Sequence, residues 1–130
     1  MTKPIAISDR LALSRHDIVV VPFPFTDKAA VKRRPALVLS ESRAFNRFAG
    51  HSVMAMITSA DNPPWPLDTP VSNLESAALP SPSVVRMKLF TLDHRFVLRK
   101  AGRLSLHDAN AVDAALAALL ETRLAAVKKR

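Results

Sequence analysis

The chain contains no cysteine among its 130 residues, which excludes disulfide bonds and thiolate metal sites. No apolar run approaches the roughly 20 residues of a membrane-spanning helix, and the N-terminal region lacks the continuous apolar stretch of a secretory signal. The histidines are scattered and have no spacing typical of a metal site: His16, His51, His94 and His107. We therefore expect a cytoplasmic protein that uses no metal, cofactor or membrane.

Acidic residues are also few, with 11 Asp and Glu against 19 Lys and Arg, so the formal net charge is +8. Such a balance favours a polyanionic partner, which could be nucleic acid, an anionic membrane surface or an acidic protein. Small proteins are also commonly basic for solubility, so the charge is a weak indicator by itself. The length and the hydrophobic fraction of 48% predict a single domain over residues 15–130, preceded by an N-terminal arm over residues 1–14.

Two uncharged runs rich in Val and Leu predict strands at about residues 17–23 and 35–41. The polar connection between them ends in a basic cluster formed by Lys32, Arg33 and Arg34, followed by Pro35. Loops held by a rigid scaffold commonly carry functional groups. We therefore expect this loop to bring three cations to one place and to form the site.

Further strands are expected at about residues 51–58, 69–73, 83–91 and 99–104. Residues 59–70 contain four of the ten prolines together with Trp65, so this stretch is expected to be a stiff surface loop rather than a central strand. In the strand at 83–91, alternation places Val85, Met87 and Leu89 on one face, and Arg86 and Lys88 on the other.

A final helix is expected to begin at Ser105, because Ser105 and Asp108 have the spacing of a capping box. Its apolar stripe at helical spacing is formed by Ala109, Val112, Leu116, Leu119, Leu120 and Val127. Short antiparallel strands followed by one long helix predict a mainly β fold with peripheral α structure. We expect a partly open barrel with the helix covering one end.

Taken in order, several segments resemble the MazF/PemK family of toxins from type II toxin–antitoxin systems: DIVVVPFPF, KRRPALVLS, MITS, SVVRMKLFTLD, and GRLS before the final helix. The resemblance covers about residues 15–127. It implies an SH3-like β-barrel that usually forms a homodimer and inhibits growth as a metal-independent endoribonuclease. Its expected partners are single-stranded RNA and a cognate antitoxin whose acidic segment occupies the RNA groove.

The resemblance also implies that Arg34 and Thr58 are catalytic. Two positions depart from the family pattern. His16 stands where relatives commonly have glycine, and Phe90 stands in a segment where many relatives carry arginine. We therefore expect an altered phosphate site at Phe90, and whether this chain is active is left open.

Cleavage of RNA without metal uses the ribose 2′-hydroxyl as the nucleophile, and the protein stabilises charge on the phosphate. The planar fork of Arg34 suits that task, and the Thr58 hydroxyl can donate or accept a hydrogen bond. Further nucleic-acid contacts are expected from Lys32, Arg33, Ser59, Trp65, Arg86 and Lys88. Trp65 could stack on a base, anchor its loop or lie at a dimer interface. Candidates for the general base, by location only, are Asp27 and Asp61.

Two other functions are compatible with the same barrel. One is a non-catalytic toxin of the CcdB type, which acts by contact with DNA gyrase. The other is a nucleic-acid-binding SH3-like module, because a fold does not determine a function. The basic cluster together with Thr58 and Ser59 favours the nuclease, since a protein that acts by contact has no need of groups that clamp a phosphate.

Overall fold

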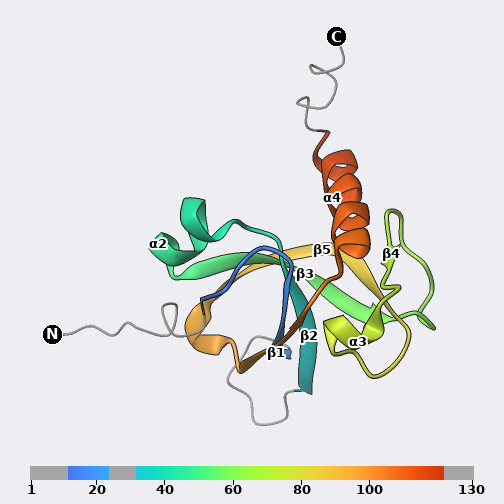
Figure 1. Cartoon of the computed structure of the whole chain (residues 1–130), viewed down its shortest axis with the longest axis horizontal. Helices are drawn as coiled ribbons and strands as arrows, with labels where there is room; N and C mark the ends of the chain where they lie inside the picture. Colours follow the sequence, from blue (N-terminus) through green and yellow to red (C-terminus); the bar gives the residue numbers. More distant parts are fainter. Residues whose placement is uncertain (1–11, 24–31, 122–130) are drawn as a thin grey trace, which may run out of the picture.

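The structure, a computed structural model, describes residues 12–23 and 32–121, and in these residues it is one curled antiparallel sheet with helices at its margins (Figure 1). Six strands of the described chain pair in the order β4-β5-β3-β2-β1-β6. The strands are β1 (Asp17–Phe23), β2 (Lys32–Val38), β3 (His51–Ser59), β4 (Thr69–Pro70), β5 (Ser83–Asp93) and β6 (Arg99–Arg103). The helical segments are η1 (Ser42–Asn46), α2 (Arg47–Ala49), α3 (Leu74–Ala77), η2 (His94–Phe96) and α4 (Leu106–Leu120). The expected mainly β fold, a partly open antiparallel barrel with a C-terminal helix, is confirmed.

Both faces of the sheet carry buried side chains. Strands β1 and β2 each contain consecutive apolar residues, which point alternately to the two faces. One face, here called the helix face, packs Ile18, Leu37 and Ile57 with Val112 of α4. The other, here called the opposite face, is formed by a second cluster of buried side chains: Leu13, Val19, Val21, Ala36, Val38, Met54, Leu92 and Val97. Side chains that lie on the opposite face nearer the strand ends are therefore attached to a packed part of the sheet.

Strand β2 begins at Lys32 and ends at Val38, three residues earlier than expected at each end. Pairing with β1 extends it, since Phe23 lies opposite Lys32. The pairs formed with β3 begin only at Ala36. Pro35, which has no N–H to donate, therefore lies where the β2–β3 ladder stops. The basic cluster thus belongs to a strand and not to a loop.

Two other bounds differ from the expected ones. Strand β4 is only Thr69–Pro70, because the side chain of Asn73 caps α3 by accepting a hydrogen bond from Ser76 N at 3.0 Å. Strand β5 has an irregularity where it faces β3, so that Leu89 is paired with Ala55 but Arg86 with the next residue, Met56. Arg86 therefore lies on the opposite face with Met56.

The end of the chain closes the helix face. A Cβ at Gly102 of β6 would lie 2.6 Å from the carbonyl oxygen of Ser76, so only glycine allows α3 to pack there. The expected cap of α4 is confirmed, because Asp108 N donates to Ser105 Oγ at 3.2 Å. Figure 1 shows the far half of α4 projecting from the barrel, consistent with the exposure of Leu120. No helix in residues 12–23 and 32–121 is long and apolar enough to cross a membrane.

Candidate functional site

Arg34 of β2 and Thr58 of β3 lie on the opposite face of the sheet. The β2–β3 register pairs Ala36 with Met56. Arg34 and Thr58 each lie two residues beyond this pair, past the point where the β2–β3 ladder ends. Side chains two residues apart in a strand share a face, so both point the same way as Ala36 and Met56. The sheet thus brings together the two residues to which the family resemblance assigns catalysis.

The surroundings of Arg34 leave its charge available. The side chain is half-buried, and its guanidinium carbon lies 5.9 Å from the centroid of the Phe23 ring. Its Nε is buried and has no hydrogen-bond partner, and no carboxylate of the described residues pairs with it. A buried donor without an acceptor is costly. An anion bound at this point would satisfy it.

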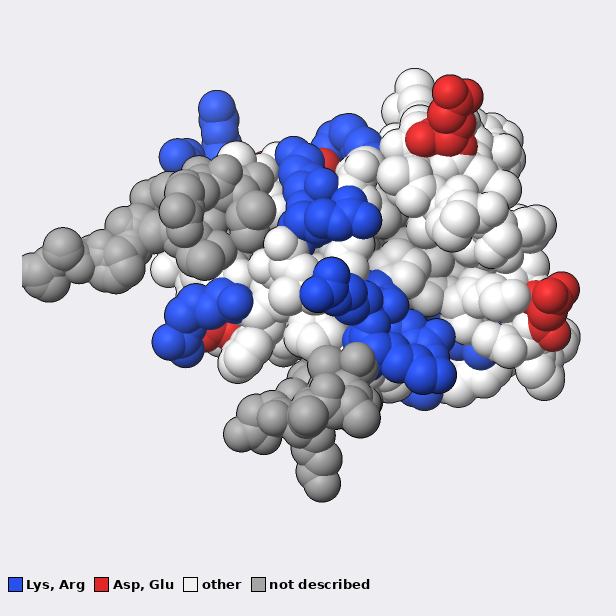
Figure 2. All heavy atoms as spheres, turned by 90° about the horizontal axis from the view of Figure 1, so that it is seen from below, with Lys and Arg blue, Asp and Glu red and all other residues white. Residues whose placement is uncertain are grey.

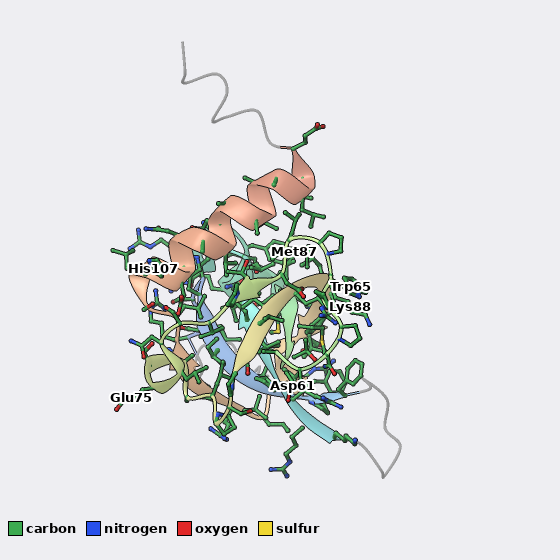
Figure 3. The ribbon with its side chains drawn as sticks, turned by 90° about the vertical axis from the view of Figure 1, so that its right-hand side faces the viewer. Asp61, Trp65, Glu75, Met87, Lys88 and His107 are labelled. Atoms are coloured by element: carbon green, nitrogen blue, oxygen red, sulfur yellow. The ribbon has the colours of Figure 1, made fainter. Side chains whose placement is uncertain are left out.

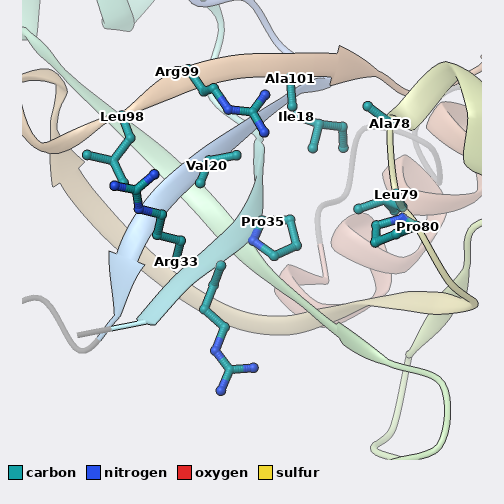
Figure 4. Close-up of a pocket in the computed structure, with 11 residues that line it drawn as sticks. Ile18, Val20, Arg33, Pro35, Ala78, Leu79, Pro80, Leu98, Arg99 and Ala101 are labelled. Carbon is teal, nitrogen blue, oxygen red and sulfur yellow. The ribbon is translucent and has the colours of Figure 1, made fainter. Parts of the chain in front are cut away.

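The basic cluster lies in a strand rather than in a loop, so its three side chains do not all point to the same face. In a strand, alternation puts Lys32 and Arg34 on one face and Arg33 on the other. Arg33 and Arg34 both line a cavity of about 420 Å³, and Figure 4 shows Val20 between Arg33 and Arg99 at its border. Figure 2 shows that Lys and Arg side chains outnumber acidic ones on this side of the molecule. Cationic side chains therefore lie on both sides of β2.

The turn after β3 is folded by its own polar groups. Asp61 N donates to Ser59 Oγ at 3.1 Å, and Asn62 N donates to the Ser59 carbonyl at 3.1 Å. The side-chain amide of Asn62 donates to Thr58 Oγ1 at 2.6 Å. Asn62 was missed in the sequence analysis, although an amide four residues after Thr58 in a turn-rich stretch was a possible signal. The turn thus supplies a defined partner for the Thr58 hydroxyl.

Arg86 is used to hold the proline-rich loop. Its Nε and Nη2 donate to the two carboxylate oxygens of Asp68 at 3.1 and 2.9 Å, and Nη2 also donates to the Pro63 carbonyl at 2.9 Å. The hydrogen bond from Arg86 lowers the pKa of Asp68 below its usual value, against the opposing effect of burial. Both side chains are largely buried, at 11% and 13% exposed. The expected contact of Arg86 with nucleic acid is therefore disfavoured, because its guanidinium already donates hydrogen bonds to Asp68 and to the Pro63 carbonyl.

The ring of Trp65 lies beside two cationic side chains of β5, those of Arg86 and Lys88. Its ring is 5.1 Å from the guanidinium carbon of Arg86 and 5.6 Å from Lys88 Nζ. The side chain is nevertheless 43% exposed. Figure 3 shows Trp65 and Lys88 side by side, with Asp61 further along the same side of the molecule. Trp65 is therefore anchored to β5 on one side and open to solvent on the other.

The remaining candidates are separated from Arg34 or cannot be placed. His51 and His94 lie at the other end of the β3–β5 pair from Thr58, where His51 is opposite Asp93. Asp27 lies outside the described residues. Asp61 is exposed and near Thr58 in the chain, and its carboxylate has no hydrogen bond or ion pair within the described residues. No group of three His, Asp or Glu side chains in the described chain is arranged to hold a metal ion.

The position of Phe90 is defined by the second core cluster. It pairs with Met54 on the opposite face and packs partly against that cluster. It therefore adds no charge to the face on which Arg34 and Thr58 lie. The cations on that face are Lys32 and Arg34 of β2 and Lys88 and Arg86 of β5, of which Arg86 is paired with Asp68.

The described chain is thus a small, partly open antiparallel β-barrel, with Arg34 and Thr58 on one face of neighbouring strands. Residues 14–120 match the family model described as PemK-like, MazF-like toxin of type II toxin–antitoxin system. The chain belongs to this family. A search among curated proteins found no match.

Solved structures with the same fold include three that illustrate the family. MazE–MazF from Deinococcus radiodurans is 25% identical, with a TM-score of 0.67, and the match covers 85% of this chain and 97% of that one. An endoribonuclease in complex with its cognate antitoxin, from a mycobacterial species, is 18% identical, with a TM-score of 0.66 and coverage of 85% and 94%. The Mycobacterium tuberculosis toxin MazF-mt6 is 21% identical, with a TM-score of 0.64 and coverage of 81% and 96%.

Proposed function

We propose that this chain is the toxin of a toxin–antitoxin pair and that it cleaves single-stranded RNA without a metal ion. The observation that carries the proposal is the placement of Arg34. Its buried Nε has no acceptor among the described residues, and Arg34 lies on the same sheet face as Thr58 of the neighbouring strand. A phosphate between them would receive hydrogen bonds from both strands.

The proposed reaction is an in-line displacement at phosphorus. The ribose 2′-oxygen forms a bond to phosphorus and loses its proton to a base, and the bond between phosphorus and the 5′-oxygen breaks. The leaving oxygen takes up a proton from solvent, so the products are a 2′,3′-cyclic phosphate and a 5′-hydroxyl end. Arg34 and Thr58 donate to the nonbridging oxygens, on which negative charge increases in the transition state.

For the base we propose Asp61, which follows β3 closely and has an exposed carboxylate. Arginine remains protonated at any physiological pH, so Arg34 does not take that role. Asp27 stays a second candidate from the sequence. Lys32 and Lys88 would attract the flanking phosphates, and the exposed side of Trp65 would stack on a base.

We propose an acidic antitoxin as the physiological inhibitor, and a homodimer as the active form. Two of the solved relatives above are complexes of a toxin with an antitoxin. The net charge of +8 suits an acidic partner segment. Such a segment would occupy the Arg34 surface and exclude RNA from it. Simultaneous tight binding of RNA and an acidic peptide would contradict a shared site.

The test is incubation of the purified protein with a long single-stranded RNA in EDTA, followed by analysis of the fragment ends. We expect discrete cuts with 5′-hydroxyl ends, which are lost in Arg34→Ala and Thr58→Ala. Arg33→Ala is the matched control, because it removes the neighbouring charge from the other face. Absence of cutting, with gyrase inhibited, would support the contact-acting toxin instead. Absence of cutting, with salt-sensitive RNA binding, would support the binding module.

A further inference from the structure

We infer that Asn62 is a positioning residue that fixes the direction in which the Thr58 hydroxyl donates its hydrogen bond. The inference rests on the proposed nuclease function and adds a residue to it. Neither the strand pattern nor the basic surface points to Asn62. It emerges from the folded turn that follows β3.

The hydrogen bond between the two side chains has a defined polarity. Asn62 Nδ2 donates to Thr58 Oγ1 at 2.6 Å. A threonine hydroxyl has one hydrogen to donate and two lone pairs that accept. Because the amide N–H can only donate, it occupies a lone pair and leaves the hydroxyl hydrogen free. That hydrogen is then available to an acceptor on the face that Thr58 shares with Arg34.

The backbone around Asn62 is fixed on both sides. On the N-terminal side, the backbone N–H of Asn62 donates to the Ser59 carbonyl at 3.1 Å. After it, the Pro63 carbonyl accepts a hydrogen bond from Arg86 at 2.9 Å. Asn62 therefore has little freedom to move away from Thr58, although it is exposed. The hydrogen bond from Arg86 to Pro63 thus helps to hold Asn62 beside Thr58.

An oriented donor matters most where charge develops during the reaction. A hydroxyl that already points at the phosphate does not have to reorganise when the transition state forms. A free hydroxyl would rotate among several acceptors, and its contribution would be diluted. We therefore assign Asn62 an effect on kcat, with little effect on the affinity for RNA.

Asn62→Asp and Asn62→Ala distinguish this role from a structural one. The carboxylate introduced by Asn62→Asp has the shape of the amide but only accepts, so it takes the Thr58 hydrogen for itself. We expect kcat to fall about 100-fold, close to the loss in Thr58→Ala, as for removal of one transition-state donor. Asn62→Ala leaves the hydrogen free but unoriented, and we expect a loss of roughly three- to tenfold. In a Thr58→Ala background, neither change should lower kcat further.

A charge control and a second readout complete the experiment. Ala60→Asp puts a carboxylate on the same exposed turn, and it should raise KM and leave kcat nearly unchanged. The Asn62 side-chain amide signals in an NMR spectrum should shift in Thr58→Val, which removes the acceptor. Wild-type cutting combined with an Asn62→Asp kcat within about twofold of wild type overturns the inference alone. A wild-type protein that cuts no RNA overturns the proposed function, and this role with it.

Discussion

Arg86 donates two hydrogen bonds to Asp68, from Nε to Oδ1 at 3.1 Å and from Nη2 to Oδ2 at 2.9 Å. The two residues are 18 positions apart: Asp68 lies near the end of the proline-rich loop at residues 59–70, and Arg86 lies on β5. Bidentate pairing of this kind fixes orientation as well as distance. Only the two residues of β4 pair with β5 in this part of the chain. The Arg86–Asp68 pair therefore adds a second attachment of the loop to β5.

Replacing Arg86 by methionine should release this loop. Trp65 is the sole tryptophan of the chain, so its fluorescence reports on the loop directly. We expect Arg86→Met to shift the emission to longer wavelength and to increase quenching by acrylamide. Lys88→Met removes the other cation near the ring but leaves the Asp68 pair, so its spectrum should stay close to that of wild type. Equal changes in the two variants would show that the ion pair does not hold the loop.

Arg33 and Arg34 are adjacent in sequence but should differ strongly in their effect on RNA cleavage. Arg34→Ala should lower kcat/KM by about 10²- to 10³-fold, because it removes a donor to the phosphate. Arg34→Lys should recover only part of the activity, since an ammonium lacks the planar fork. Arg33→Ala should cost only a few-fold, through lost long-range attraction. Similar losses for the two alanine variants, measured with one RNA at one salt concentration, would contradict the separation by strand alternation.

The apolar strands were predictable from the sequence because burial of both faces leaves an uninterrupted apolar run, as in Ile18–Val21 of β1. Their register was not, and it decides where the cations point. The start of β2 at Lys32 depends on pairing with Phe23, a contact across the sheet that no local pattern records. Arg33 was therefore grouped with Arg34 in one loop, although the two side chains alternate along β2.

The loop contacts could not be predicted for a different reason. Arg86 alternates as a solvent-facing strand residue should, and only the folded path of the loop brings Asp68 to it. Asn62 likewise meets Thr58 because a turn folds back on the strand. Such contacts have no periodicity, so composition and spacing mark the loop as stiff without showing what it holds.

Trp65 should contribute to RNA affinity through its exposed ring. Stacking of a base on an aromatic side chain is worth about 1–3 kcal/mol, so Trp65→Ala should weaken binding by at least about fivefold. Trp65→Phe should keep most of the affinity, because it retains an aromatic face. The measurement is the Kd for an RNA analogue with 2′-deoxyribose throughout, which cannot be cleaved by this route. Unchanged affinity in Trp65→Ala would leave loop anchoring as the role of this residue.

His16 should tolerate glycine better than alanine. Its φ of 76° lies in the left-handed region, which glycine adopts without strain. Its Nε2 also lies 2.8 Å from Asp113 Oδ1 of α4. His16→Ala loses that contact and keeps the strained backbone, so we expect a destabilisation of about 1–2 kcal/mol. His16→Gly loses the contact but relieves the strain, and urea unfolding should rank it between His16→Ala and wild type.

His94 should make the folded state less stable in weak acid. The residue is 2% exposed, its Nε2 lies 2.7 Å from Ser52 Oγ, and its Nδ1 has no hydrogen-bond partner among the described residues. Burial lowers the pKa of His94, and nearby His51 lowers it further, while Asp93 opposes the change. As the pH falls below about 6.5, the unfolded chain takes up a proton that the folded chain does not bind.

The contribution of His94 to stability is thus complete above the unfolded pKa and is lost as the pH falls toward the lower, folded pKa. The free energy of unfolding in urea should decrease between pH 7.5 and pH 5.5, by at most about 1.4 kcal/mol per pH unit for one proton. His94→Gln cannot titrate, so its stability should depend less on pH over that interval, whatever its stability at pH 7.5. The same slope in both proteins would assign the acid sensitivity to another group, because the difference between them isolates this one proton.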